Sequence, residues 1–235
     1  YDSFKYEKND YYDMTADINV TDYDGKQYYQ WDAENNYWNG HEWDSAEPWQ
    51  PVLNGYEDKY KQVKGSLYNN SRIFGVNRYD AIHNSCKDLP NVNEMATYVM
   101  KGDPHWDGEK LWSAMGHLHK GGMWFKTKAS ISFTYYFDSE RAPNGPDMRD
   151  SEGSVSNTPT QGTPVQNYIN RYFFVPALGY YSFGAFVGLG TKGSYWTSSA
   201  HPDDSNWAYR LTFSNSRVTV DGPDSSEGAY TMKFE

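Results

Sequence analysis

The sequence predicts an α+β fold, with helices in the middle of the chain and a β-rich C-terminal part. Residues 92–119 carry apolar side chains at helical spacing, whereas residues from Tyr172 onward alternate between apolar and polar side chains, as strands do. Aromatic residues make up 18% of the chain, and all hydrophobic types together make up 37%. Because each aromatic ring buries a large area, we expect a compact core built mainly from Tyr, Trp and Phe.

The N-terminal part is polar and rich in aromatic residues. Residues 18–31 hold two short alternating stretches around the turn signal at Asp24 and Gly25, which predicts a β-hairpin. Four tryptophans lie among Gly, Asn and Pro and predict an ordered loop: Trp31, Trp38, Trp43 and Trp49. We expect residues 1–84 to form an extension packed on the main core of residues 85–235. The alternative is a small separate attachment domain.

The first predicted helix spans residues 92–101. Asn91 is a good N-cap, and Glu94 follows three residues later, as in a capping box. Gly102 stands where a helix commonly ends.

The second predicted helix spans residues 108–119. Asp107 can cap its start, and Gly121 with Gly122 can end it. Its apolar stripe consists of Leu111, Trp112, Met115 and Leu118. The predicted fold therefore has two helices, followed by short and mostly antiparallel strands.

The C-terminal part follows a long segment typical of a loop. Residues 138–167 are dominated by Ser, Pro, Gly, Asn, Thr and Asp, and long loops in compact domains are commonly functional. Four strands are predicted after it, at residues 172–176, 194–199, 207–213 and 217–220. Within the last two, Leu211, Phe213, Val218 and Val220 alternate with polar residues, so these four side chains are expected to face the core.

Charge and cysteine content narrow the function. The net charge is −10, so we expect no nucleic-acid partner, because phosphate contacts need a basic stripe. The single cysteine, Cys86, cannot form a disulfide within the chain and is expected to be a small buried apolar residue. No apolar run approaches the ~18 residues of a membrane helix, so we expect no transmembrane segment. The chain begins at Tyr1, as a mature or trimmed fragment would.

Three motifs resemble a known family. The stretch Leu89–Met95 is similar to the Leu-Pro element that opens a helix in bacterial C-type-lectin-like domains, including relatives of formylglycine-generating enzymes. Gly193–Ser199, followed by Ala208–Phe213, resembles the Gly-x-Tyr-Trp-Ser-Ser and Ala-x-x-Leu-x-Phe pattern that closes such domains in gut-bacterial surface proteins. The resemblance covers about residues 85–235. It implies a C-type-lectin-like fold in a secreted or surface-displayed bacterial protein.

The Tyr-, Ser- and Asn-rich C-terminal stretch also resembles the variable proteins of diversity-generating retroelements. Those proteins display a hypervariable ligand-binding face on the same fold. The resemblance implies such a face within Tyr180–Asp221, and an ordinary aromatic-rich core in this stretch is the alternative.

The sequence departs from the family at two chemical sites. The family's calcium-dependent sugar-binding motifs are absent, since Ala142-Pro143-Asn144 lacks the carboxylate and Asn206-Trp207 has no following Asp. Formylglycine-generating enzymes use a pair of cysteines, whereas this chain has Cys86 alone. We therefore predict no enzyme activity, no cofactor and no bound metal.

The candidate ligand-binding face follows from strand alternation. With the apolar residues of 207–220 facing inward, their polar neighbours face outward beside the loop 200–206 and the aromatic residues of 180–186. The predicted ligand-binding residues are Tyr180, Tyr181, Phe183, Phe186, His201, Asp203, Asp204, Asn206, Arg210, Thr212, Arg217, Thr219 and Asp221. Rigid aromatic rings beside adaptable polar groups are typical of binding surfaces, and the expected ligand is a glycan or a protein on another surface. Replacing Tyr181 or Arg210 with Ala is expected to weaken binding without unfolding the domain.

Two other functions compete with recognition. A glycan hydrolase could use a zinc site with ligands drawn from Asp103, His105, His117 and His119. It could instead use a carboxylate pair, either Glu42 with Asp44 or Asp203 with Asp204. The spacing of His117 and His119 puts them on different sides of a helix, which favours capping and surface roles. The other competing function is a surface-assembly subunit such as a fimbrial tip, which an exposed edge strand near the N-terminus would favour.

Overall fold

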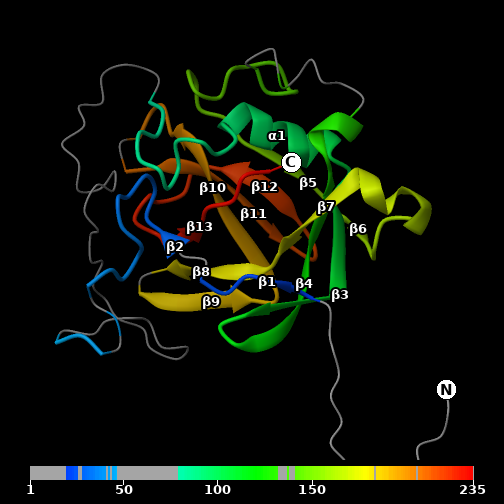
Figure 1. Cartoon of the computed structure of the whole chain (residues 1–235). Coiled ribbons are helices and arrows are strands. Elements are labelled where there is room, and N and C mark those ends of the chain that lie inside the picture. The colour runs from blue at the N-terminus through cyan, green and yellow to red at the C-terminus, as the bar shows by residue number, and fades with distance from the viewer. Residues whose placement is uncertain are drawn as a thin grey trace, which may run out of the picture.

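The computed structural model describes residues 20–25, 28–40, 42, 44–46, 79–131, 137, 141–182, 184–204 and 206–234. These residues form a mostly-β structure with two mixed sheets, one of which curves into a half-barrel (Figure 1). The sheets surround a large cluster of buried aromatic side chains. The predicted α+β class is therefore corrected to mostly β. The expectation of mostly antiparallel strands is confirmed, because seven of the eleven strand pairings are antiparallel.

The first sheet has five strands. Its order is β1 (Thr21–Asp22), β3 (His105–Ala114), β4 (His117–Lys126) and β7 (Tyr172–Pro176), and β6 (Thr160–Gln161) also pairs with β3. Strand β4 pairs antiparallel with β3 and with β7, and the short strands β1 and β6 lie parallel to β3.

The second sheet has eight strands and contains the motifs of the C-terminal part. Its main path is β2 (Tyr28–Tyr29), β13 (Ala229–Tyr230), β10 (Lys192–Ala200), β11 (Ala208–Ser214), β12 (Val218–Asp221) and β5 (Val155–Asn157). Strand β8 (Leu178–Ser182) pairs with β10 and with β9 (Ala185–Leu189). The predicted strands at 172–176, 194–199, 207–213 and 217–220 are thus confirmed as β7, β10, β11 and β12 within one or two residues.

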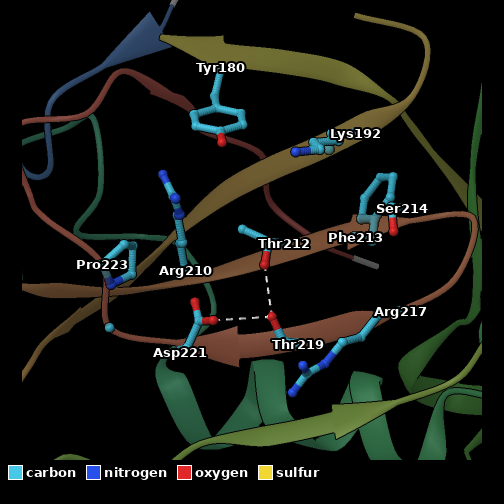
Figure 2. Close-up of a pocket in the computed structure, with 12 residues that line it drawn as sticks. Tyr180, Lys192, Arg210, Thr212, Phe213, Ser214, Arg217, Thr219, Asp221 and Pro223 are labelled. Atoms are coloured by element: carbon cyan, nitrogen blue, oxygen red, sulfur yellow. Dashed lines mark hydrogen bonds between the residues drawn. The ribbon is translucent and has the colours of Figure 1, made fainter. Parts of the chain in front are cut away.

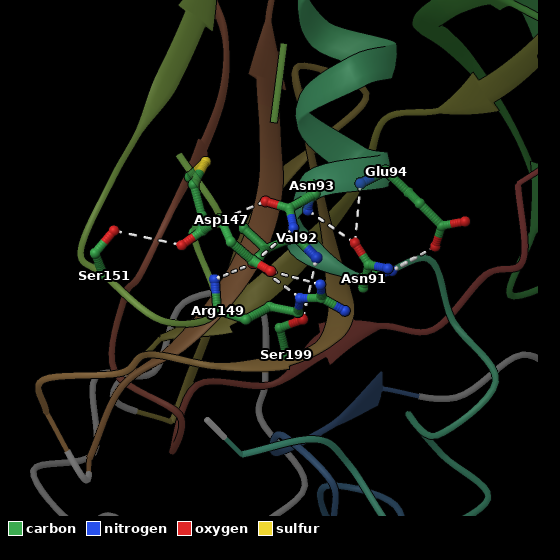
Figure 3. A network of polar contacts seen from close by, with 9 residues as sticks. Asn91, Val92, Asn93, Glu94, Asp147, Arg149, Ser151 and Ser199 are labelled. Atoms are coloured by element: carbon green, nitrogen blue, oxygen red, sulfur yellow. Dashed lines mark hydrogen bonds and ion pairs between the residues drawn. The ribbon is translucent and has the colours of Figure 1, made fainter. Parts of the chain in front are cut away.

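Helix α1 (Val92–Lys101) is confirmed with its predicted boundaries. The Asn91 side chain accepts hydrogen bonds from the backbone N–H groups of Asn93 and Glu94, and the Glu94 carboxylate accepts one from the Asn91 N–H (Figure 3). Gly102 is the C-cap, and its N–H donates to the Tyr98 carbonyl. The other helical elements with described bounds are the short 3-10 segments η2 (Lys128–Ser130) and η3 (Gln166–Arg171).

A polar network connects α1 to the segment before β5. The Asn93 amide donates to the Asp147 carboxylate at 2.8 Å, and Arg149 forms hydrogen bonds to both oxygens of that carboxylate at 2.9 and 2.6 Å (Figure 3). Burial of the Asp147 carboxylate disfavours its charge, but the bonds from Arg149 and Asn93 outweigh burial and lower its pKa from 3.8 to about 2.

The second predicted helix is wrong. Residues 105–126 form the β3–β4 hairpin, whose two-residue turn is Met115-Gly116, with φ of +55° and +68°. Positive φ at both central residues is the requirement of a type I′ hairpin turn. Gly121 and Gly122, predicted to end the helix, lie inside β4, where a Cβ on Gly122 would meet the Phe174 ring at 2.3 Å. The Asp107 side chain does accept from two following N–H groups, but at an irregularity in β3.

Two other predictions also need correction. The predicted hairpin at 18–31 is wrong, because β1 pairs with β3 and β2 pairs with β13. The turn signal itself is present, since Gly25 has φ +73°. The predicted loop 138–167 contains the short strands β5 and β6.

The N-terminal tryptophans that the structure describes contact the second sheet. Trp31 is fully buried, and its indole N–H donates to the Thr197 carbonyl of β10 at 2.8 Å. Trp38 packs against Tyr181 with ring centroids 5.0 Å apart. Trp43 and Trp49 lie outside the described residues.

Packing between β10 and β11 requires a glycine at position 193, the first residue of the Gly-x-Tyr-Trp motif. A Cβ at this position would lie 2.1 Å from the Phe213 ring of β11, which stacks on Tyr195 at 5.9 Å between centroids. The glycine therefore lets β10 and β11 share a flat aromatic layer.

Among the described residues, no helix is long and apolar enough to cross a membrane.

Candidate functional site

The candidate site lies on the face of β10, β11 and β12 that points away from the core. Leu211, Phe213, Val218 and Val220 are at most 3% exposed and face the core, as predicted. Because side chains alternate along a strand, the residues between them lie on the opposite face. The pairing places Trp196, Arg210 and Asp221 in one row across the strands, and Ser194, Thr212 and Thr219 in the next.

An open cavity of about 490 Å³ lies over this outer face (Figure 2). It is lined by Tyr180, Lys192, Gly193, Arg210, Thr212, Phe213, Ser214, Arg217, Thr219, Asp221, Gly222 and Pro223. Six predicted ligand-binding residues are therefore brought together: Tyr180, Arg210, Thr212, Arg217, Thr219 and Asp221. We call this cavity the sheet pocket.

Arg210 is the most strongly held residue of the sheet pocket. Its side chain is 8% exposed and forms an ion pair with Glu227, which comes from the segment before β13. Its guanidinium carbon lies 4.9 Å from the Tyr180 ring centroid and 5.6 Å from that of Trp196, within the range of cation–π attraction. The Ser182 hydroxyl donates to Glu227 at 2.8 Å and so fixes the carboxylate.

Nη1 of Arg210 and Oε2 of Glu227 form this ion pair with each other. Two further buried polar atoms, Nε of Arg210 and Oγ of Ser194 on β10 beside Thr212, have no hydrogen-bond partner among the described residues. Buried donors without an acceptor are uncommon and call for an explanation.

A short polar chain crosses the floor of the sheet pocket. The Thr212 and Thr219 hydroxyl oxygens lie 2.7 Å apart, and the Thr219 hydroxyl donates to the Asp221 carboxylate at 3.3 Å (Figure 2). Asp221 is partly exposed, so the chain ends at a carboxylate that solvent can reach. These groups offer both donors and acceptors to a polar ligand.

Lys192 and Arg217 provide two further cations, and both are exposed. Neither side chain makes a hydrogen bond or an ion pair with any part of the chain that the structure describes, while the Arg210 side chain is held by Glu227. The prediction from sequence missed Lys192 because the strand was predicted to begin at Ser194. Extending the alternation back by two residues would have placed Lys192 on the outer face.

The remaining predicted binding residues do not line the sheet pocket. Tyr181 and Phe186 are 4% and 7% exposed and belong to the aromatic core. The expectation that Tyr181→Ala leaves the fold intact is therefore revised. Phe183 lies outside the described residues.

The loop after β10 borders the sheet pocket without lining it. The His201 ring is buried and lies 5.2 Å from Tyr209, and a Cβ on the pocket residue Gly222 would stand 2.4 Å from it. Asp203, Asp204 and Asn206 are exposed or half-buried around this histidine.

The residues of the metal hypothesis lie on the first sheet. His105 and Asp103 are 3.5 Å apart, and Lys126 also pairs with Asp103, at 3.0 Å. His119 contacts the Ala114 carbonyl at 3.1 Å near the hairpin turn, and its ring centroid is 6.4 Å from that of His117. Within the described ranges, no three or more of His, Cys, Asp and Glu gather as metal ligands would.

Comparison with protein-family models, with curated proteins and with solved structures found no match for this chain.

Proposed function

We propose that this chain is a non-enzymatic recognition domain that binds a glycan in the sheet pocket. The observation that carries the proposal is the convergence of Tyr180, Arg210 and the Thr212–Thr219–Asp221 chain around one open cavity. Its volume, about 490 Å³, is in the range of small-ligand sites, roughly 300–1,000 Å³. Hydroxyls, a carboxylate and cations suit a ligand rich in hydroxyl groups.

The proposal includes a C-type-lectin-like fold and an adhesin-like role outside a bacterial cell. In support, the Leu-Pro element directly precedes α1, and the two C-terminal motifs fall on the neighbouring antiparallel strands β10 and β11. A diversified face, as in retroelement variable proteins, is compatible with this layout. Thr212, Arg217 and Asp221 point away from the core, so substitutions there change the pocket with little effect on packing.

The competing function, glycan hydrolysis, would require a pocket with different residues. Glycoside hydrolysis generally needs two carboxyl groups that flank the bond to be cut. The described lining of the sheet pocket carries one, Asp221, which already accepts a hydrogen bond from Thr219. Incubation with the bound glycan tests this directly, because a hydrolase releases shortened sugars and a lectin leaves the glycan intact.

The decisive experiment is a glycan array probed with the purified domain and with a matched pair of variants. The double variant Thr212→Val/Thr219→Val keeps side-chain shape and removes the two pocket hydroxyls. The control Thr160→Val changes an exposed threonine of β6 in the other sheet. We expect binding to a defined glycan that the first variant loses and the control keeps. Loss in neither variant would show that the glycan binds elsewhere.

Calcium dependence is tested on the same array. Since the calcium motifs are absent and no ligand cluster occurs among the described residues, we expect a chelator to leave binding unchanged. Binding that disappears with the chelator would contradict the metal-independent site. Absence of any glycan binding would favour a protein ligand or surface assembly.

A further inference from the structure

The sheet pocket has a charge opposite to that of the whole chain. The chain has 21 basic and 31 acidic residues, which gives a net charge of −10. The pocket lining has three cations, Lys192, Arg210 and Arg217, and one anion, Asp221, a balance of three minus one, or +2. Counting Glu227 behind Arg210 leaves +1. A locally positive cavity on an acidic protein points to a ligand with negative charge.

The three cations differ in how they are held. Arg210 is buried, and its guanidinium is fixed between two rings and a carboxylate. Lys192 and Arg217 are exposed at the other end of the sheet pocket, and Figure 2 shows both on the Phe213–Ser214 side. The site thus combines one preorganised donor with two adjustable charges.

The uncharged groups define the rest of the ligand. Between the cations lie the hydroxyls of Thr212 and Thr219, in a chain that ends at Asp221. A simple inorganic anion would gain nothing from Asp221, because like charges repel. A sugar hydroxyl, in contrast, can donate to Asp221 and accept from a threonine hydroxyl.

We infer that the sheet pocket recognises an acidic sugar, whose carboxylate is bound by the pocket cations and whose hydroxyls contact the threonines and Asp221. This inference rests on the proposed function and names its ligand class. Guanidinium groups bind carboxylates in two-point geometry, and charge-assisted hydrogen bonds are about twice as strong as neutral ones. Uronic acids and sialic acids share this combination of carboxylate and hydroxyls.

The test compares matched glycans that differ in the carboxylate alone. The probes are oligogalacturonate and its carboxyl-reduced form, for uronic acids, and sialyllactose and lactose, for sialic acids. We expect at least one acidic member to bind roughly tenfold or more tightly than its neutral partner, with affinity falling as salt rises. The pair that shows the preference identifies which acidic sugar is bound.

Two charge-neutralising variants test the residues. Lys192→Gln/Arg217→Gln alters exposed side chains and should lower affinity for the acidic glycan about tenfold while the melting temperature stays unchanged. Lys233→Gln, which removes an exposed charge beside a different cavity, should bind as the unchanged protein does.

The outcomes separate the two proposals. Equal affinity for acidic and neutral partners, or full binding by the double variant, would overturn the acidic-sugar inference and leave glycan recognition standing. Failure to bind any glycan would overturn both. Binding to poly-glutamate with no glycan binding would replace the sugar with an acidic protein segment and would likewise overturn the inference.

Discussion

Tyr180 and Tyr181 are adjacent on β8 and should respond to mutation in opposite ways. Tyr180 is half-buried, lines the sheet pocket and contacts the Arg210 guanidinium. Tyr181 points to the other side, where four rings surround it at centroid distances of 4.8 to 5.1 Å: Tyr28, Tyr37, Trp38 and Phe186. Tyr180→Ala should therefore affect binding, and Tyr181→Ala should affect stability.

The two variants are expected to differ several-fold in how much folding free energy they lose. Truncating a buried aromatic side chain costs about 3–5 kcal/mol, because apolar contacts are lost and a cavity remains. At about 2–4 °C per kcal/mol for a chain of this size, Tyr181→Ala should lower the melting temperature by roughly 6–20 °C. Tyr180→Ala mainly removes a cation–π contact, worth about 0.5–2 kcal/mol, so its melting temperature should fall by a few degrees.

The assay pairs thermal unfolding with glycan binding below the melting temperature of both variants. Tyr180→Ala should lose at least about fivefold in affinity, roughly 1 kcal/mol, while remaining folded. Tyr181→Ala should be strongly destabilised yet bind with near-normal affinity in its folded fraction. If Tyr181→Ala melted within about 2 °C of the unchanged protein, or if Tyr180→Ala were the less stable of the two, the assignment of the two faces of β8 would be refuted.

Two further predictions concern charged side chains in ion pairs. Arg210→Gln leaves the mostly buried Glu227 without its cation and should cost about 3–5 kcal/mol in urea unfolding, whereas Arg210→Gln/Glu227→Gln should recover most of that loss; no recovery would contradict the pairing. The Asp147 pKa is lowered on folding, so its stabilising contribution is complete above its unfolded value of 3.8 and is lost as pH falls through about 2. Asp147→Asn should be less stable at pH 7 and should lose less stability between pH 4 and 2; parallel pH profiles for the two proteins would contradict this.

The parts of the fold that sequence predicted well depend on local signals. Helix α1 has a capping box at Asn91 and Glu94 and a glycine at its end, and all three act within a few residues. Strands β11 and β12 alternate strictly, and because one face is buried, their register is determined by the pattern itself.

The β3–β4 hairpin was mistaken for a helix because its apolar residues fit both periods. Leu111, Met115 and Leu118 match a helical stripe, but they are 38 to 51% exposed, whereas Trp112 and Ala114 are buried two residues apart. The turn Met115-Gly116 also lacks the Asn-Gly or Asp-Gly pair that usually marks a type I′ turn. Strand β4 pairs with β7, which lies far along the chain, and this pairing favours a strand over a helix at residues 117–126. The spacing of apolar residues in a single sequence does not report such pairing.

The same limit explains which site residues were assigned correctly. Alternation along β11 and β12 placed Arg210, Thr212, Thr219 and Asp221 on the outer face, and all four line the sheet pocket. Tyr181 lies on a strand whose pairing with β10 is long-range, so its direction could not be derived from the local Gly-rich sequence.

All but one of the charged residues of the sheet pocket can be substituted in a way that changes ligand binding without changing the stability of the fold. Lys192, Arg217 and Asp221 are exposed or half-buried on a face whose reverse side is the core, so they can change without opening a cavity. Arg210 is the exception, because it is buried against Trp196 and paired with Glu227. If this face is diversified among related chains, variation should concentrate at the first three positions, while Arg210 and Glu227 should be kept or change together.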